Sequence, residues 1–186
     1  MEKRYFDLLQ ENPVIAAVRD DKGLAKCLEA DVKMVFILYG DICNIPAIVD
    51  RVKDANKVAV VHADLISGLA GKEVSVEFLK KHTRADGIIS TRINLVQTAL
   101  QLGMLAILRV FLIDSMSLDT VLNLRVRPDA IDVLPGLMPE IIQRVHAGSG
   151  IPVLTGGLIT EKQQVMAALS AGALAVSTTN PKIWDM

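Results

Sequence analysis

Polar residues of two kinds follow short apolar runs in this 186-residue sequence, and both kinds suit the binding of a small anion. Glycines and hydroxyl residues can hold phosphate oxygens through N–H and O–H groups. Arginine or histidine beside aspartate can bind an anion or move a proton. The first kind comprises Gly156, Gly157, Ser177 and Thr178. The second kind comprises His62, Asp64, Arg92, Arg109 and Asp132.

The segment from residue 151 to 180, IPVLTGGLITEKQQVMAALSAGALAVSTTN, carries the strongest local pattern. One apolar run ends at Gly156 and Gly157, a helical segment follows, and a second apolar run ends at Ser177 and Thr178. Glycine lets backbone N–H groups approach phosphate oxygens, because no Cβ stands in the way. A tight turn with a capping Ser/Thr cluster would use the same residues. We favour the phosphate interpretation.

Two pairs of charged residues leave more than one interpretation open. Arg109 lies within the apolar run MLAILRVFLI, so its guanidinium needs an acceptor, which is either Asp132 in a structural ion pair or a ligand anion. His62 and Asp64 could be metal ligands, a base with its orienting carboxylate, or a polar pair touching ligand hydroxyls. No third ligand follows at a recognisable spacing, so we expect the polar pair and no metal.

Two basic clusters and two cysteines complete the candidates. The cysteines, Cys27 and Cys43, have no histidine motif beside them, so we predict no nucleophile and no catalytic residue. The basic residues could contact a nucleic-acid backbone, although solvated helix ends often carry such clusters. These basic residues are Lys80, Lys81, Arg84, Arg125 and Arg127.

The elements that position these residues alternate between strand and helix. Segments with helical spacing separate the apolar runs, and Thr160 with Gln163 predicts a capping box for the last of them. Runs that are apolar throughout are typical of parallel strands covered on both faces. The eight predicted strands are Val14–Val18, Met34–Leu38, Lys57–Val61, Gly87–Ser90, Met104–Val110, Ala130–Leu134, Ile151–Leu154 and Leu174–Ser177.

This alternation predicts an α/β fold, a compact (βα)8 TIM-like barrel in a single domain over residues 1–186, with residues 1–12 as an N-terminal lead-in. A doubly wound open sheet is the alternative, because it has the same alternation. Eight strands and the absence of a glycine-rich nucleotide loop after the first strand favour the barrel. In such a barrel the ligand site lies at the carboxyl ends of the strands.

Composition narrows the classes of protein further. Hydrophobic residues make up 51% of the chain and the formal net charge is −1, which excludes a disordered chain and argues against a generic nucleic-acid binder. The first residues, MEKRYFDLLQENP, do not resemble a secretory signal, and no apolar run is long enough for a membrane span. We therefore expect a soluble, cytoplasmic protein that does not bind membranes.

Several segments, in order along the chain, carry a resemblance to a known family. They are PVIAAVRD, HADLISGL, DGIISTR, FLIDS, DVLPGLMP, IPVLTGGLIT and AVSTTN. From about Asn12 to Trp184 the chain resembles the glycerol-uptake operon antiterminators, regulators that respond to glycerol 3-phosphate. The resemblance implies a barrel that binds glycerol 3-phosphate without turning it over, and that binds a leader mRNA so that transcription passes a terminator upstream of glycerol genes.

The resemblance also assigns roles to the residues introduced above. The phosphate motif falls on Gly156, Gly157, Ser177 and Thr178, and the charged group from His62 to Asp132 forms the polar mouth of the barrel. The expected partners are glycerol 3-phosphate, leader mRNA and a possible second copy of the chain, with no cofactor. The alternative function is a barrel enzyme, an isomerase, aldolase or lyase, acting on a small phosphorylated substrate.

Overall fold

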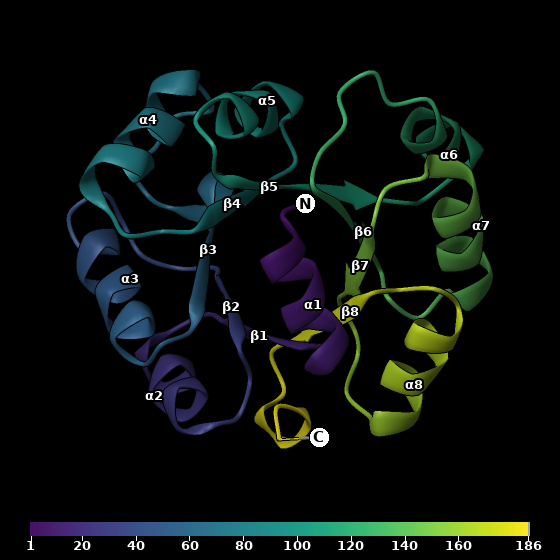
Figure 1. Ribbon diagram of the computed structural model, residues 1–186, viewed down its shortest axis with the longest axis horizontal. Helices are drawn as coiled ribbons and strands as arrows, with labels where there is room; N and C mark the ends of the chain where they lie inside the picture. The colour runs from purple at the N-terminus through teal and green to yellow at the C-terminus, as the bar shows by residue number, and fades with distance from the viewer. Residues whose placement is uncertain (186) are drawn as a thin grey trace.

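The computed structural model describes residues 1–185 and shows a closed barrel of eight parallel strands in the order of the chain (Figure 1). The barrel closes because β1 pairs with β8, where Val14 lies opposite Val176 and Ile15 opposite Ser177. The predicted barrel is therefore confirmed, and the open sheet is wrong. The strands are β1 (Val14–Val18), β2 (Met34–Ile37), β3 (Val58–His62), β4 (Gly87–Ser90), β5 (Leu105–Phe111), β6 (Ala130–Leu134), β7 (Val153–Gly156) and β8 (Ala175–Thr178).

Apart from the first helix, which precedes the first strand, the helices follow strands and cover the outside of the barrel. Side-chain caps start several of them: Asp20 accepts from the backbone N–H of Gly23 at 2.7 Å, and Asp114 forms a capping box with Ser117. The helices are α1 (Lys3–Glu11), α2 (Asp21–Glu29), α3 (Ile45–Asp54), α4 (Glu73–His82), α5 (Ile93–Gln101), α6 (Ser115–Leu122), α7 (Pro139–Ser149) and α8 (Lys162–Ser170), with short 3-10 turns η1 (Ala63–Leu65) and η2 (Pro181–Ile183).

The apolar core has two layers, one between the strands and the outer helices and one inside the barrel. Alternate residues of each strand enter the two layers; Ile15 and Phe36 pack inside, whereas Ala16 and Val35 face the helices. This double burial explains why the strands are apolar throughout. Inside the barrel the apolar layer stops near the carboxyl ends of the strands, where buried Arg109 and Asp132 replace it.

The predicted lead-in over residues 1–12 contains helix α1, which lies across the opposite, amino end of the barrel (Figure 1). Its residues Tyr5 and Leu9 are buried in the inner layer. One end of the barrel is thus closed by the chain's own first helix, and the loops at the other end are left to form a ligand site. Among the described residues, no helix is long and apolar enough to cross a membrane.

Candidate functional site

A cavity of about 340 Å³ opens at the carboxyl ends of the strands. It lies between β8 with the loops after β7 and β8 on one side and residues at the carboxyl ends of β1, β2, β5 and β6 on the other. Its lining includes two arginines and three threonine or serine hydroxyl residues of β8 and its loop, and no carboxylate among the described residues. It is lined by Ala17, Arg19, Leu38, Arg109, Leu134, Gly157, Leu158, Ile159, Thr160, Ser177, Thr178 and Thr179.

The loop after β7 has an unusual backbone. Gly157 has φ +75° and Leu158 has φ +63°, a left-handed conformation that is uncommon for a residue with a side chain. Such conformations gather at ligand sites, where the surrounding structure holds them. No hydrogen bond within residues 1–185 uses the backbone N–H of Gly157, Leu158 or Thr179. These N–H groups can therefore donate to an anion in the cavity.

The two hydroxyl residues of β8, Ser177 and Thr178, differ in their hydrogen bonds. Thr178 Oγ1 donates to the carbonyl oxygen of Ile159 at 2.8 Å, which fastens the loop after β7 to the end of β8. Ser177 lines the cavity, and its hydroxyl makes no hydrogen bond within residues 1–185. Among the predicted phosphate residues, Ser177, Thr178 and Gly157 therefore come together at one cavity.

Gly156 lies apart from the cavity, because it is the last residue of β7 and pairs with Ser177. A Cβ on Gly156 would lie 2.1 Å from Ser177 Oγ, so close packing between the strands requires glycine there. A capping box of the protein's own side chains also forms at the N-terminus of α8. This capping box is Glu161 with Gln164, one residue later than the predicted Thr160 with Gln163. The lining of the cavity reaches Thr160 but no residue of α8, so the donors that face the cavity are in the loops and not at the helix end.

Arg109 connects the cavity to a buried carboxylate. Its Nε donates to Asp132 Oδ2 at 2.7 Å, as the register places these two residues side by side. Burial raises the pKa of the Asp132 carboxyl above its usual value, and the charge of Arg109 opposes this rise only in part. The ion pair uses only Nε, so the terminal nitrogens of Arg109 remain for a ligand in the cavity that Arg109 lines. The two interpretations left open by the sequence are compatible: Arg109 forms a structural pair and can also bind an anion.

His62 ends β3 and is buried, close enough to Arg109 for that charge to act on it. Burial and the positive charge of Arg109 lower the pKa of His62 to about 4, so it is neutral at pH 7. Its Nδ1 is 3.8 Å from Asp64 Oδ2, too far for a hydrogen bond.

Asp64 contacts β4 instead, where its carboxylate accepts from Ser90 Oγ at 2.9 Å and from the backbone N–H of Thr91 at 2.7 Å. Arg92 precedes α5, with its side chain 57% exposed and its Nε 3.6 Å from Asp64 Oδ1. Neither Asp64 nor Arg92 lines the cavity. The polar mouth is thus divided into a group at the cavity and a second group at the end of β4.

Arg19 is a cavity residue that the sequence did not single out. It directly follows β1 and lines the cavity opposite the loops after β7 and β8. Its position directly after a fully buried strand is the signal that could have identified it, because the same signal pointed to His62. Within residues 1–185, no three His, Cys, Asp or Glu side chains are placed to hold a metal ion.

The basic residues that could contact RNA lie at the other end of the barrel, in α4 and in the loops that lead into β4 and β6. Arg84 pairs with Asp54 at 2.7 Å, Lys81 with Glu77 at 3.1 Å, and Arg127 donates to the carbonyl oxygen of Gly150 at 3.0 Å. Lys80 and Arg125 are exposed and form no such contact within residues 1–185.

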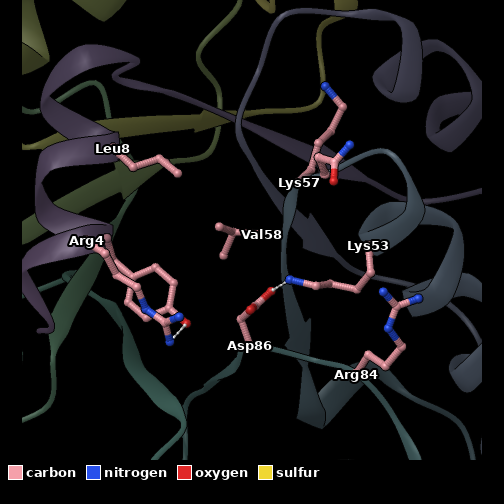
Figure 2. Close-up of a pocket in the computed structure, with 9 residues that line it drawn as sticks. Arg4, Leu8, Lys53, Lys57, Val58, Arg84 and Asp86 are labelled. Carbon is pink, nitrogen blue, oxygen red and sulfur yellow. Dashed lines mark hydrogen bonds and ion pairs between the residues drawn. The ribbon is translucent and has the colours of Figure 1, made fainter.

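A second cavity, of about 360 Å³, opens beside Arg84 at this end (Figure 2). Figure 2 shows Lys53 pointing at Asp86, to which its Nζ is bound at 2.6 Å. Lys57, also in its lining, donates to the carbonyl oxygens of Ala30 and Val32. The basic side chains here are bound to groups of the protein, whereas Arg109 at the mouth uses only Nε in its ion pair and keeps its terminal nitrogens for a ligand.

The comparison with known families decides which proteins this chain belongs with. Residues 14–184 match the family described as glycerol-3-phosphate responsive antiterminator. The chain belongs to this family. The family is a regulatory one, and the resemblance found in the sequence is confirmed.

Individual relatives agree with this membership. The chain is 39% identical to the uncharacterized protein YgcP of Escherichia coli K12, over 96% of this chain and 95% of YgcP. The solved glycerol uptake operon antiterminator regulatory protein of Listeria monocytogenes superposes with a TM-score of 0.88 at 38% identity, over 92% of this chain and 94% of that one. An antiterminator-related protein of Thermotoga maritima gives a TM-score of 0.82 at 28% identity, over 94% and 99% of the two chains.

Enzymes share the fold at much lower identity. The deoxyribose phosphate aldolase of Aeropyrum pernix superposes with a TM-score of 0.70 at 14% identity, covering 96% of this chain and 89% of that one. At this identity the similarity extends to the barrel alone.

Proposed function

We propose that glycerol 3-phosphate binds in the mouth cavity and controls the binding of a leader mRNA, so that transcription passes a terminator upstream of glycerol-utilisation genes. The observation that carries the first half is the charge of the cavity. Arg19 and Arg109 line it together with free backbone N–H groups, and no carboxylate lines it among the described residues. A phosphate monoester is a small dianion, and such a lining offers it donors without a competing negative charge.

The proposed binding mode places the phosphate between Gly157 and Ser177, with Arg109 reaching it from the facing side of the cavity. Thr178 holds the loop in position through its bond to Ile159. Gly156 allows β7 and β8 to pack closely enough for Ser177 to enter the site. Asp64 and Arg92 order the neighbouring loop after β4 and contact the glycerol end only if that loop closes over it. No cofactor takes part.

The RNA half of the proposal uses a separate surface. An RNA hairpin is too large to enter the cavity, and Lys80, Lys81, Arg84, Arg125 and Arg127 lie at the opposite end of the barrel. These residues are therefore not part of the loops at the mouth. Ligand binding at the mouth has to change the RNA affinity of the opposite end through the barrel and its helices. The RNA is a transcript, so the proposed compartment is the cytoplasm. A second copy of the chain would double the number of cations presented to the RNA.

The test is a titration of leader RNA with and without saturating glycerol 3-phosphate, repeated at several salt concentrations. Binding free energies are reciprocal, so RNA must also tighten glycerol 3-phosphate binding by the same factor, and a factor of about 5 to 150 is typical of such coupling. Equal RNA affinity in both arms would show that the ligand does not control RNA binding. If the protein binds no RNA in either arm, its function would be to sense glycerol 3-phosphate and act on a different partner.

We propose further that the protein does not turn glycerol 3-phosphate over. Neither a lysine nor a cysteine lines the cavity among the described residues, so the lining offers no Schiff-base or thiolate nucleophile. Incubation with glycerol 3-phosphate or dihydroxyacetone phosphate, with and without divalent metal, should leave both compounds unchanged. Steady product formation that Asp64→Asn removes would favour the enzyme instead.

A further inference from the structure

The cavity at the amino end of the barrel contains two groups that suit a flat polar ring. Figure 2 shows α1 on one side of this cavity, and α3 with the loops before β3 and β4 on the other. Lysines fix its walls, because Lys53 is bound to Asp86 and Lys57 to two backbone carbonyl oxygens. The two groups that are open to a ligand are the guanidinium face of Arg4 and the side-chain amide of Asn56.

Arg4 of α1 presents a flat cation that is held in place. Its Cζ lies 4.4 Å from the centroid of the Tyr5 ring, and its Nη2 donates to the Tyr5 hydroxyl at 2.8 Å. Tyr5 is buried and covers one face of the guanidinium, while Nε of Arg4 pairs with Glu2 at 2.8 Å. The Arg4 side chain is 66% exposed, so the face turned away from Tyr5 is open. Proteins that bind single-stranded RNA stack unpaired bases on guanidinium planes and aromatic rings.

Asn56 offers hydrogen bonds in the same cavity. It lies between α3 and β3 with φ +57°, a left-handed conformation that asparagine adopts more readily than most residues. It is exposed, and its side-chain amide makes no hydrogen bond within residues 1–185. An amide can donate and accept at the same time, which matches the edge of a nucleobase. Arg4 and Asn56 thus supply a stacking surface and a group that can bind the edge of a stacked ring.

The size and surroundings of the cavity fit one nucleotide. Small-molecule sites typically have about 300–1,000 Å³, and this cavity has about 360 Å³, with Leu8 and Val58 as apolar contacts for a ring. Outside the cavity, Lys80 is exposed and has no partner in the described part of the chain. It precedes Arg84 of the lining by four residues. A strand with one base in the cavity can therefore place a phosphate near Lys80.

We propose that the amino-end cavity binds one unpaired nucleotide of the RNA, with its base stacked on Arg4 and the edge of the base bonded to Asn56. This inference rests on the RNA half of the proposed function and assigns a site to it. An acidic segment of a protein partner would use the charge of Arg4 but not its plane. Lysine has the same charge without the plane, so Arg4→Lys separates the two kinds of partner.

The experiment is a fluorescence-anisotropy titration of the full-length protein with single-stranded leader RNA, and with the same RNA annealed to its complement. Arg4→Lys should lower the affinity for the single strand about fivefold to a hundredfold, the usual effect of losing one stacked base. The slope of log affinity against log salt should not change, because the charge is kept. The affinity for the duplex should be equal in the wild type and this variant, because the duplex has no unpaired base.

Two further variants and a free nucleotide complete the experiment. Asn56→Gly removes the amide and tolerates the positive φ, so it should fold and lower the single-strand affinity about twofold to tenfold. Arg51→Lys makes the same change as Arg4→Lys at an arginine of α3 that pairs with Asp21 and does not line the cavity, so its affinities should equal those of the wild type. An excess of adenosine monophosphate should leave the RNA bound.

The alternative outcomes separate this inference from the proposed function. Equal single-strand affinity in the wild type and Arg4→Lys would overturn the inference, and so would an equal loss of affinity for the single strand and the duplex. Displacement of the RNA by adenosine monophosphate would also overturn it and assign the cavity to a free nucleotide. In these three cases the wild type still binds RNA, so the proposed function stands. A wild-type protein that binds neither RNA would overturn both the inference and the RNA half of the proposed function.

Discussion

Gly157 provides the backbone geometry on which anion binding depends. Its φ of +75° suits glycine, and an added Cβ would lie 3.4 Å from Leu134 Cδ2, so the local space tolerates a side chain. Gly157→Asp should therefore fold and lower glycerol 3-phosphate affinity at least about a hundredfold, because a carboxylate beside the phosphate costs several kcal/mol. Calorimetric titration measures this change.

The matched control is Gly103→Asp in the loop before β5. Gly103 also has a positive φ, of +64°, and an added Cβ there would meet nothing within 4 Å. This variant has a similar backbone strain, about 1 kcal/mol, and the same added charge, but at the other end of the barrel. Its affinity should equal that of the wild type. Unchanged affinity in Gly157→Asp would show that the phosphate binds elsewhere.

His62 should make the stability of the protein depend on pH. Its pKa is 6.5 in the unfolded chain and about 4 in the folded one. Between these values the unfolded state binds a proton that the folded state does not, so the free energy of unfolding falls as the pH is lowered from 6.5 to about 4, by up to about 3 kcal/mol. Above pH 6.5 this histidine contributes no slope.

Urea denaturation between pH 4.5 and 7.5 measures this dependence in wild type and in His62→Gln. The variant has no titrating group at this position, so its unfolding free energy should fall less on acidification. Identical pH dependence in the two proteins would mean that another group causes it.

Individual strands show how far the sequence alone predicts the elements. β1, β4 and β6 begin and end at the predicted residues, because their apolar runs are bounded by polar residues or by proline. β7 begins two residues later than the predicted start at Ile151. Pro152 cannot donate to a neighbouring strand, which explains the delay.

Helix α1 and the division of the mouth depend on tertiary contacts, so the sequence did not predict them. α1 covers the end of the barrel with only a few apolar side chains, and no local pattern indicates that role. The sequence placed Arg92 and Asp64 beside Arg109 because all three lie at or just beyond the carboxyl end of a predicted strand. In the fold, Asp64 accepts hydrogen bonds from Ser90 and Thr91, and Arg92 lies beside Asp64 instead of beside Arg109.

Leu9 of α1 tests the importance of this covering helix. It is fully buried in the inner layer, so Leu9→Ala should lower the free energy of unfolding by about 2–5 kcal/mol. Val74→Ala, at a 62% exposed position of α4, should have little effect. Chemical denaturation measures both. Glycerol 3-phosphate affinity should not change in Leu9→Ala, because α1 lies at the end opposite the mouth; a large loss would mean that the two ends are coupled.

The molecule as a whole separates its two proposed partners between the two ends of the barrel. Because the net charge is −1, RNA contact must depend on a few cations, and Lys80 and Arg125 are the ones without a partner in the described part of the chain. Replacing either with alanine should reduce the slope of log affinity against log salt by about one. Titration of leader RNA at several salt concentrations measures this slope.

Lys72 provides the control for Lys80, because it precedes α4 at the mouth end whereas Lys80 lies near the other end of the same helix. Lys72→Ala should leave the salt slope unchanged. A lower salt slope for Lys72→Ala, together with an unchanged slope for Lys80→Ala, would instead show that the RNA binds at the mouth end.

The position of the ligand is the central claim, and a crystal structure of the protein with glycerol 3-phosphate tests it most directly. The phosphate should lie in the mouth cavity, accepting from the backbone N–H of Gly157 and from Ser177 Oγ, with Arg109 on the facing side. A phosphate bound instead between Lys53 and Arg84 at the amino end of the barrel would contradict the claim.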